Sequence, residues 1–192
     1  MAGTVCEAVE FGWGPALLEH ALEGETDLLG AVQLAEALTS GMADGDTELD
    51  GEALIDLLRV WERLEAMVSG RKQLALAAVV DATTDLGLQA EEARHEVGAA
   101  LRLAPVTASD RTRVAVELRD RLPATLTLLC RGEIGWRQAA NVADGVRDLP
   151  DDVALAVEAR VLDRMPHQTA AETRRSVADA VVRIDPAAAL AR

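Results

Sequence analysis

Hydroxyl and guanidinium side chains that could contact a nucleic-acid backbone are concentrated in the segment Glu96–Leu118. A short apolar stretch, a turn at Ala104-Pro105 and a second, polar stretch give this segment helix-turn-helix character. On the early turns of the second helix, hydroxyls could contact phosphates, and arginines could bind phosphates or guanine edges. The candidate contact residues of this helix are Thr107, Ser109, Arg111 and Arg113. One alternative stays open, a helical hairpin whose arginines pair with aspartates on a solvated face.

A second helical corner is expected at Leu128–Ala143. Gly132 and Gly135 would form the turn, with Ile134 buried between them. Arg137 and Gln138 open the helix that follows and are the other two candidate contacts, to nucleic acid or to a protein partner. Trp136 occupies the same turn, where an indole is more typical of a core or hinge position than of base stacking.

Motifs for catalysis or metal binding are missing from the sequence. His20, His95 and His167 are far apart, and neither HExxH nor a paired CxxC occurs. GxSxG, the phosphate-binding loop and GxGxxG are also lacking. Two cysteines, Cys6 and Cys130, are too few for a disulfide framework. We therefore expect no catalytic residue, no metal site and no cofactor, and we expect the chain not to be an enzyme.

The composition favours helices. Of the 192 residues, 49% are hydrophobic but only 2% are aromatic, so the core must consist of Leu, Val and Ala. These residues suit close helix packing, and strand-forming aromatics are nearly absent. No apolar run reaches the roughly 18 residues of a membrane span, and the N-terminus lacks the basic region of a secretory signal. The expected location is the cytoplasm, with no membrane partner.

The net charge of −14 is unevenly distributed. Residues 1–92 contain 19 acidic and 4 basic residues, whereas residues 93–192 contain 14 acidic and 15 basic residues. The acidic first part repels nucleic acid at long range. If DNA is a partner, it must bind through the second half of the chain.

The sequence predicts an all-α multi-helix bundle, with one long spine helix followed by an array of short helices that includes helix-turn-helix-like corners. Residues 1–14 are expected to be a flexible leader, residues 15–185 a single helical domain, and residues 186–192 a linker-like tail. Within the domain, 15–87 would form acidic N-terminal helices and 90–185 the short-helix array. Helices are expected near 15–24, 27–39, 51–87, 90–103, 105–121, 123–131, 136–147, 151–165 and 170–184.

The strongest periodic signal begins after Ser40–Asp50, a stretch rich in Gly and Asp that is expected to be a loop. Asp50 can cap the helix that follows. That helix has leucines at three- and four-residue steps and would kink at Ser69-Gly70. Long helices of this kind form bundle spines or dimer interfaces, so self-association through the Leu-rich helix is a second functional hypothesis.

Several segments together resemble domain of unknown function family 222, the actinobacterial 13E12 repeat group. The resemblance covers roughly residues 15–190. Its landmarks are Leu103-Ala104-Pro105 with Thr107, Leu122-Pro123-Ala124-Thr125, Gly132-Glu133-Ile134, Ala159-Arg160-Val161-Leu162, and Thr169 ahead of Arg174-Arg175.

The resemblance implies a role beside a nuclease. Family members commonly carry this helical domain ahead of a C-terminal HNH endonuclease module, which has a Cys/His-rich metal-binding segment. The present sequence contains no such segment, so the chemistry of that module cannot be assigned to any residue here. The leading hypothesis is a non-catalytic helical accessory domain that engages DNA or a partner. The alternative is a structural or oligomerisation module with no nucleic-acid role.

Overall fold

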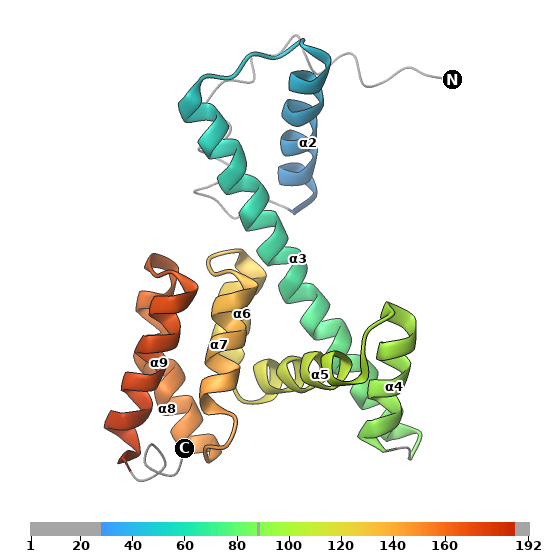
Figure 1. Ribbon diagram of the computed structural model, residues 1–192, viewed down its shortest axis with the longest axis vertical. Coiled ribbons are helices and arrows are strands. Elements are labelled where there is room, and N and C mark those ends of the chain that lie inside the picture. Colours follow the sequence, from blue (N-terminus) through green and yellow to red (C-terminus); the bar gives the residue numbers. More distant parts are fainter. Residues whose placement is uncertain (1–27, 88, 187–192) are drawn as a thin grey trace. The chain divides into compact units, whose positions relative to one another are not determined.

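The computed structural model describes residues 28–87 and 89–186, and these residues form helices and connecting turns with no strand. This architecture confirms the all-α prediction, including the long helix (Figure 1). The elements are α2 (Leu28–Asp44), α3 (Gly51–Asp85), α4 (Ala90–Leu101), α5 (Pro105–Asp120), α6 (Pro123–Arg131), α7 (Trp136–Val146), α8 (Asp151–Val161), the 3₁₀ helix η2 (Leu162–His167) and α9 (Ala170–Ile184). The predicted leader, the predicted helix at 15–24 and tail residues 187–192 lie outside the described residues.

Packing divides the chain into two compact units, Met1–Leu64 and Glu65–Arg192, with the division inside α3. The sequence predicts a single domain over 15–185, with acidic helices up to residue 87 and the short-helix array from residue 90. Periodicity follows the helix without a break, so it gives no sign of where the packing partners of α3 change.

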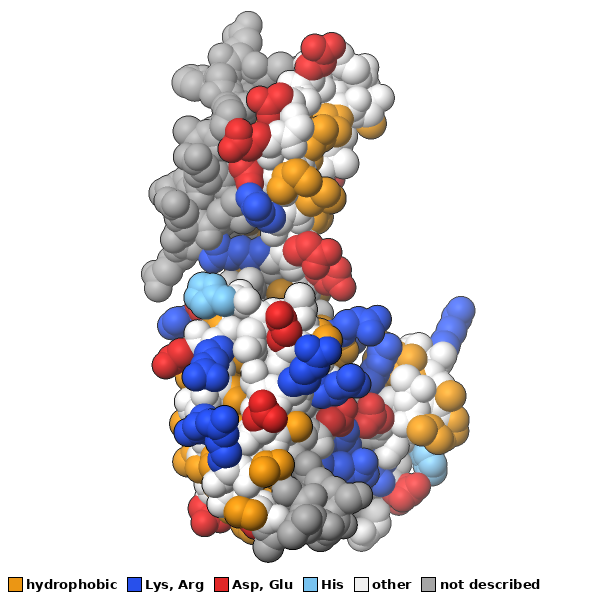
Figure 2. All heavy atoms as spheres, turned by 60° about the vertical axis from the view of Figure 1, so that its left-hand side comes forward, with side chains coloured by type: hydrophobic (Ala, Val, Ile, Leu, Met, Phe, Trp, Pro, Cys, Tyr) orange, Lys and Arg blue, Asp and Glu red, His pale blue; other side chains and the backbone are white. Residues whose placement is uncertain are grey.

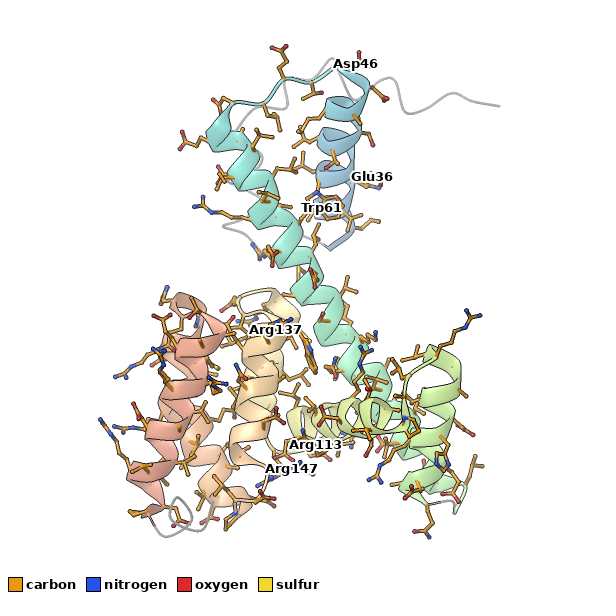
Figure 3. All side chains as sticks on the ribbon, in the orientation of Figure 1. Glu36, Asp46, Trp61, Arg113, Arg137 and Arg147 are labelled. Carbon is orange, nitrogen blue, oxygen red and sulfur yellow. The ribbon has the colours of Figure 1, made fainter. Side chains whose placement is uncertain are left out.

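The described part of the first unit is α2 packed against the N-terminal part of α3. Its core residues are Ala31, Leu34, Ala35, Leu38, Ala53, Leu57, Val60 and Leu64. Their three- and four-residue spacing puts one apolar stripe of each helix in the contact. Asp50 caps α3 as predicted, because its Oδ1 accepts a hydrogen bond from the amide of Ala53 at 2.9 Å. The Nε1 of Trp61 donates to Oγ1 of Thr39 at 3.1 Å, so this indole joins the two helices (Figure 3).

The loop predicted over Ser40–Asp50 is wrong in its first half, because α2 continues to Asp44. The helix ends at Gly45, whose φ of 78° is readily adopted only by glycine. The amide of Gly45 donates to the carbonyl of Met42 and that of Asp46 to the carbonyl of Gly41, which is a Schellman ending. Of the two glycines in the stretch, the second therefore ends the helix, and Gly41 lies within it.

Helix α3 continues as one helix through Ser69-Gly70. Gly70 is instead required for a close approach to α6. A Cβ at this position would lie 2.7 Å from Sγ of Cys130 and 2.8 Å from its backbone nitrogen. Next to it, Nη1 of Arg71 donates to the carbonyl oxygen of Cys130 at 3.2 Å. Gly70 thus lets two backbones meet, which accounts for a glycine inside the longest helix of the described residues.

The main core of the second unit lies among α5–α9. Its largest fully buried side chains include Leu118, Leu122, Leu129, Val142, Val157 and Met165. In Figure 1, α7, α8 and α9 lie side by side, and α5 crosses from them toward α4. A smaller cluster of Leu76, Ala77, Val97 and Ala115 holds the end of α3 against α4 and α5. One buried carboxylate, Glu158 on α8, accepts the amide hydrogen of Thr125 at 2.7 Å and so satisfies a free donor at the start of α6.

Turn residues set the two predicted corners. Helix α4 ends at Arg102, a non-glycine residue with a positive φ of 54°. Helix α6 ends at Gly132, with φ of 72°, and both α4 and α6 have Schellman endings. Ile134, only 2% exposed, fills the α6–α7 corner as predicted.

The predicted α-helix over 151–165 is wrong beyond Val161. From Leu162 to His167 the chain is a 3₁₀ helix that contains Pro166. Proline has no amide hydrogen and its ring clashes with the preceding turn of an α-helix, which favours the tighter geometry here. Met165 is fully buried in this segment and fixes the connection to α9.

Candidate nucleic-acid interface

The six predicted contact residues lie on two helices of the second unit. Thr107, Ser109, Arg111 and Arg113 are on α5, and Arg137 and Gln138 are in the first turn of α7. Thr107 and Arg137 are exposed, whereas the other four are half-buried. Exposure and hydrogen bonding separate the residues that could bind a ligand from those that hold the fold.

Arg113 is engaged in the fold. Its Nη2 donates to Asp110 at 2.6 Å on the same helix and to Asp144 on α7 at 2.5 Å. Burial lowers the pKa of the Arg113 guanidinium, but hydrogen bonds to the two aspartates outweigh it and raise the pKa overall. A guanidinium held by two carboxylates is poorly placed to bind a phosphate, so its part in contact stays a prediction.

Gln138 likewise serves as a structural link. Its Oε1 accepts the amide hydrogen of Gly135 at 2.8 Å, which caps α7. Its Nε2 donates to the carbonyls of Met165 and Gln168 at 2.7 and 2.8 Å. The side chain therefore ties the start of α7 to the segment that leads into α9.

Two arginines at the end of α5 and just after it also pair with acids. Arg119 contacts Asp81 at 2.5 Å and Asp120 at 2.6 Å, and Arg121 contacts Asp151 at 2.7 Å and also Glu117. The Arg113–Asp110 pair fits the alternative of a hairpin with Arg–Asp pairs, whereas Arg119 and Arg121 lie beyond the segment Glu96–Leu118 for which that alternative was predicted. Thr107 and Ser109 remain available at the start of α5, together with Arg111.

A groove between α7 and α9 combines exposed cations with small side chains. It has a volume of about 550 Å³ and is lined by Trp136, Arg137, Ala140, Asn141, Ala170, Ala171 and Arg174. Arg137 and Arg174 are both exposed, and none of the described residues that line the groove carries a carboxylate. In Figure 3, Arg137 lies at one end of α7, and Arg113 and Arg147 lie toward the other.

Hydrogen bonds and close packing fix the two walls of this groove. Nδ2 of Asn141 donates to the carbonyl of Ala170 at 2.7 Å and so joins the two helices at the groove. Thr169 caps α9 together with Glu172, each accepting the other's amide hydrogen. Further along, Gly145 is packed so tightly against Val177 that any Cβ there would overlap with it. The groove is therefore built on rigid elements.

The second unit is much closer to neutral than the first, so it repels an anion less. Residues 1–64 contain 14 acidic and 2 basic residues, whereas residues 65–192 contain 19 acidic and 17 basic residues. Figure 2 shows Lys and Arg side chains spread over one side of the second unit, with acidic side chains between them. Arginine forms bidentate hydrogen bonds with phosphate and with carboxylate, so the groove can hold either anion.

Of the two arginines in the groove, the sequence predicted only Arg137 as a contact. Arg174 served as a family landmark, and Trp136 as a core or hinge residue, which is half correct because it packs partly against the core. Asn141 carried no signal at all. A three- or four-residue repeat of small and polar residues near both helix starts could have pointed to a shared face.

Residues 28–87 and 89–186 contain neither a metal-binding cluster nor a membrane-spanning helix. No group of three or more His, Cys, Asp or Glu residues is arranged to hold a metal ion. None of the helices in this part is long and apolar enough to cross a membrane.

The comparisons with known proteins identify a family but no individual relative. Neither the curated proteins nor the solved structures contain a match to the chain. The model of the domain of unknown function DUF222 matches residues 55–192, which include most of α3 and all the helices that follow it. The match contains both predicted corners and the groove between α7 and α9. The chain therefore belongs to the DUF222 family.

Proposed function

We propose that the second unit is a non-catalytic helical domain that binds DNA through the groove between α7 and α9. The observation that carries this proposal is the pair of exposed arginines, Arg137 and Arg174, in a groove lined, among residues 28–87 and 89–186, by no carboxylate. Phosphate contacts of this kind supply most of the sequence-independent affinity for DNA. Thr107, Ser109 and Arg111 on α5 are proposed as additional contacts.

The same proposal fits the place beside a nuclease module that the resemblance implies. The resemblance stated above implies a domain that precedes an HNH endonuclease module. A helical domain that contacts the DNA backbone would serve such a module by engaging the target. Catalysis is not part of the role proposed for this chain.

Titration of duplex DNA with the purified chain at low ionic strength, followed by fluorescence anisotropy, tests the proposal. Arg137→Ala with Arg174→Ala should weaken binding strongly. Arg147→Ala with Arg183→Ala is the matched control, because it removes the same charge from near the ends of α7 and α9. Equal losses in the two double variants, or no binding by the wild-type chain, would refute the groove as the DNA site.

Self-association through α3 is a second candidate function, favoured by one specific observation. Ile55 and Leu58 are 49% and 60% exposed, although Leu57 beside them is 5% exposed. Together with Trp61, which is 38% exposed, they recur at three-residue steps along α3. The same stripe on a second copy of the chain would bury these side chains, as in antiparallel or parallel helix pairs.

A further inference from the structure

One residue of the groove is not explained by phosphate binding. Trp136 is half-buried, packs partly against the core of the second unit, and also lines the groove. An indole contributes no charge, so a site for the phosphate backbone alone would not need it. The residues beside it in the groove include Ala140, Ala170 and Ala171, whose small side chains leave space next to the ring.

The combination of ring, cations and space fits a nucleotide better than a bare phosphate. The groove volume of about 550 Å³ lies within the roughly 300–1,000 Å³ of sites that hold small molecules. Aromatic side chains bind unpaired bases by stacking, and arginines beside them hold the strand. In a duplex the faces of the bases are covered by their neighbours, so an indole can stack only on an unpaired or terminal base.

Asn141 adds a polar group at a fixed position in the same groove. Its Nδ2 is used by the carbonyl of Ala170, at 2.7 Å. This bond holds the amide in place and leaves Oδ1 as the atom that can accept a hydrogen bond. An amino group on the edge of a base is a suitable donor.

We propose that the groove takes one unpaired nucleotide of a DNA strand, with the base stacked on Trp136 and the phosphates bound by Arg137 and Arg174. This inference rests on the proposed DNA binding and specifies its ligand. It predicts a preference for single strands, overhangs and frayed ends over blunt duplex.

The experiment compares three probes on the full chain: a short single-stranded oligonucleotide, the same backbone with abasic sites throughout, and a relaxed closed-circular duplex, which has neither ends nor unpaired bases. Trp136→Leu should weaken binding of the single strand about tenfold, which is the usual size of one lost base–aromatic stack. The affinity of the Trp136→Leu variant for the abasic strand and for the circular duplex should change little. Trp136→Phe, which keeps an aromatic face, should retain most of the single-strand affinity.

A second measurement leaves Trp136 in place, so it is decisive even if Trp136→Leu does not fold. In the Trp13→Phe, Trp61→Phe variant, Trp136 is the only tryptophan, and stacking should quench its fluorescence when the single strand binds but not when the abasic strand binds.

Equal quenching by the two strands, or no quenching at saturation, would overturn the stacked nucleotide. If the two strands and the circular duplex bind, and binding depends on Arg137 and Arg174 but not on Trp136, only this inference fails. If no probe binds, the proposed DNA binding fails with it.

Discussion

Nη2 of Arg113 on α5 lies 2.5 Å from Oδ1 of Asp144 on α7, and this ion pair joins two helices that are distant in sequence. The arginine side chain is 19% exposed and the aspartate 58%. A second carboxylate, Asp110, contacts the same guanidinium at 2.6 Å. A residue that the sequence presents as a DNA contact therefore has a structural role.

Removing this guanidinium should reduce stability. We expect Arg113→Ala to lower the free energy of unfolding by about 1 kcal/mol, because two carboxylates lose their partner and the pair is partly shielded from water. Urea unfolding followed by circular dichroism measures the change. Arg111→Ala, on the same helix, should stay within about 0.5 kcal/mol of the wild type. Equal losses in the two variants would contradict the structural role of Arg113.

Gly70 provides a test of the α3–α6 contact. Gly70→Ala should destabilise the second unit by about 1–3 kcal/mol, since the new methyl group meets the backbone of Cys130 and the helices must separate. Gly98→Ala is the matched control. Its Cβ would lie 3.4 Å from Cβ of Ala108, an ordinary contact, and alanine favours the helix. In thermal unfolding, Gly70→Ala should therefore lower the Tm, whereas Gly98→Ala should leave it unchanged or raise it. An unchanged Tm for Gly70→Ala would argue against the close approach.

Cys130 should react slowly near neutral pH. Burial raises the pKa of the Cys130 thiol, although the charge of Arg71 acts in the lowering direction. A raised pKa leaves less thiolate at a given pH, and the thiolate is the form that is alkylated. Iodoacetamide labelling at about pH 8, quantified on the Cys130 peptide, should be slower in the native chain than in urea, and the native rate should keep rising above the usual thiol pKa of about 8.5. Equal native and unfolded rates would contradict this prediction.

The effect of a charged substitution in α3 depends on which leucine is replaced. Leu58→Asp should abolish any dimer while leaving the first unit folded, because Leu58 is 60% exposed. Leu57→Asp should instead disrupt the α2–α3 core, because Leu57 is 5% exposed and charge burial is costly. Sedimentation over a range of concentrations distinguishes these effects. A monomeric wild-type chain at high concentration would exclude the alternative function.

The helices were largely predictable because local chemistry marks their ends. Pro105 and Pro123 stand at first helical positions, Asp50 caps α3, and Gly132 provides the left-handed ending of α6. Residues 40–50 contain two glycines, Gly41 and Gly45, and the sequence alone does not show that Gly45 is the one with a positive φ. The 3₁₀ turn before α9 also depends on burial of Met165, which periodicity does not reveal.

The site was less predictable because it is formed by tertiary packing. Arg137 and Arg174 line one groove only because α7 and α9 pack together, with Gly145 permitting close contact. Ion pairs such as Arg113–Asp144 join different helices, so the sequence could not show which arginines are already paired. Leu57 and Leu58 are adjacent and chemically identical, and only the fold distinguishes the buried one from the exposed one.

The salt dependence of duplex DNA binding tests the central claim most directly. The logarithm of the binding constant falls with the logarithm of salt concentration by about 0.9 for each neutralised phosphate. The slope of Arg137→Ala with Arg174→Ala should therefore be shallower than that of the wild type by about 2. Arg147→Ala with Arg183→Ala should keep the wild-type slope. An unchanged slope for Arg137→Ala with Arg174→Ala would contradict DNA binding by this groove. A slope that becomes equally shallow in Arg147→Ala with Arg183→Ala would contradict it as well.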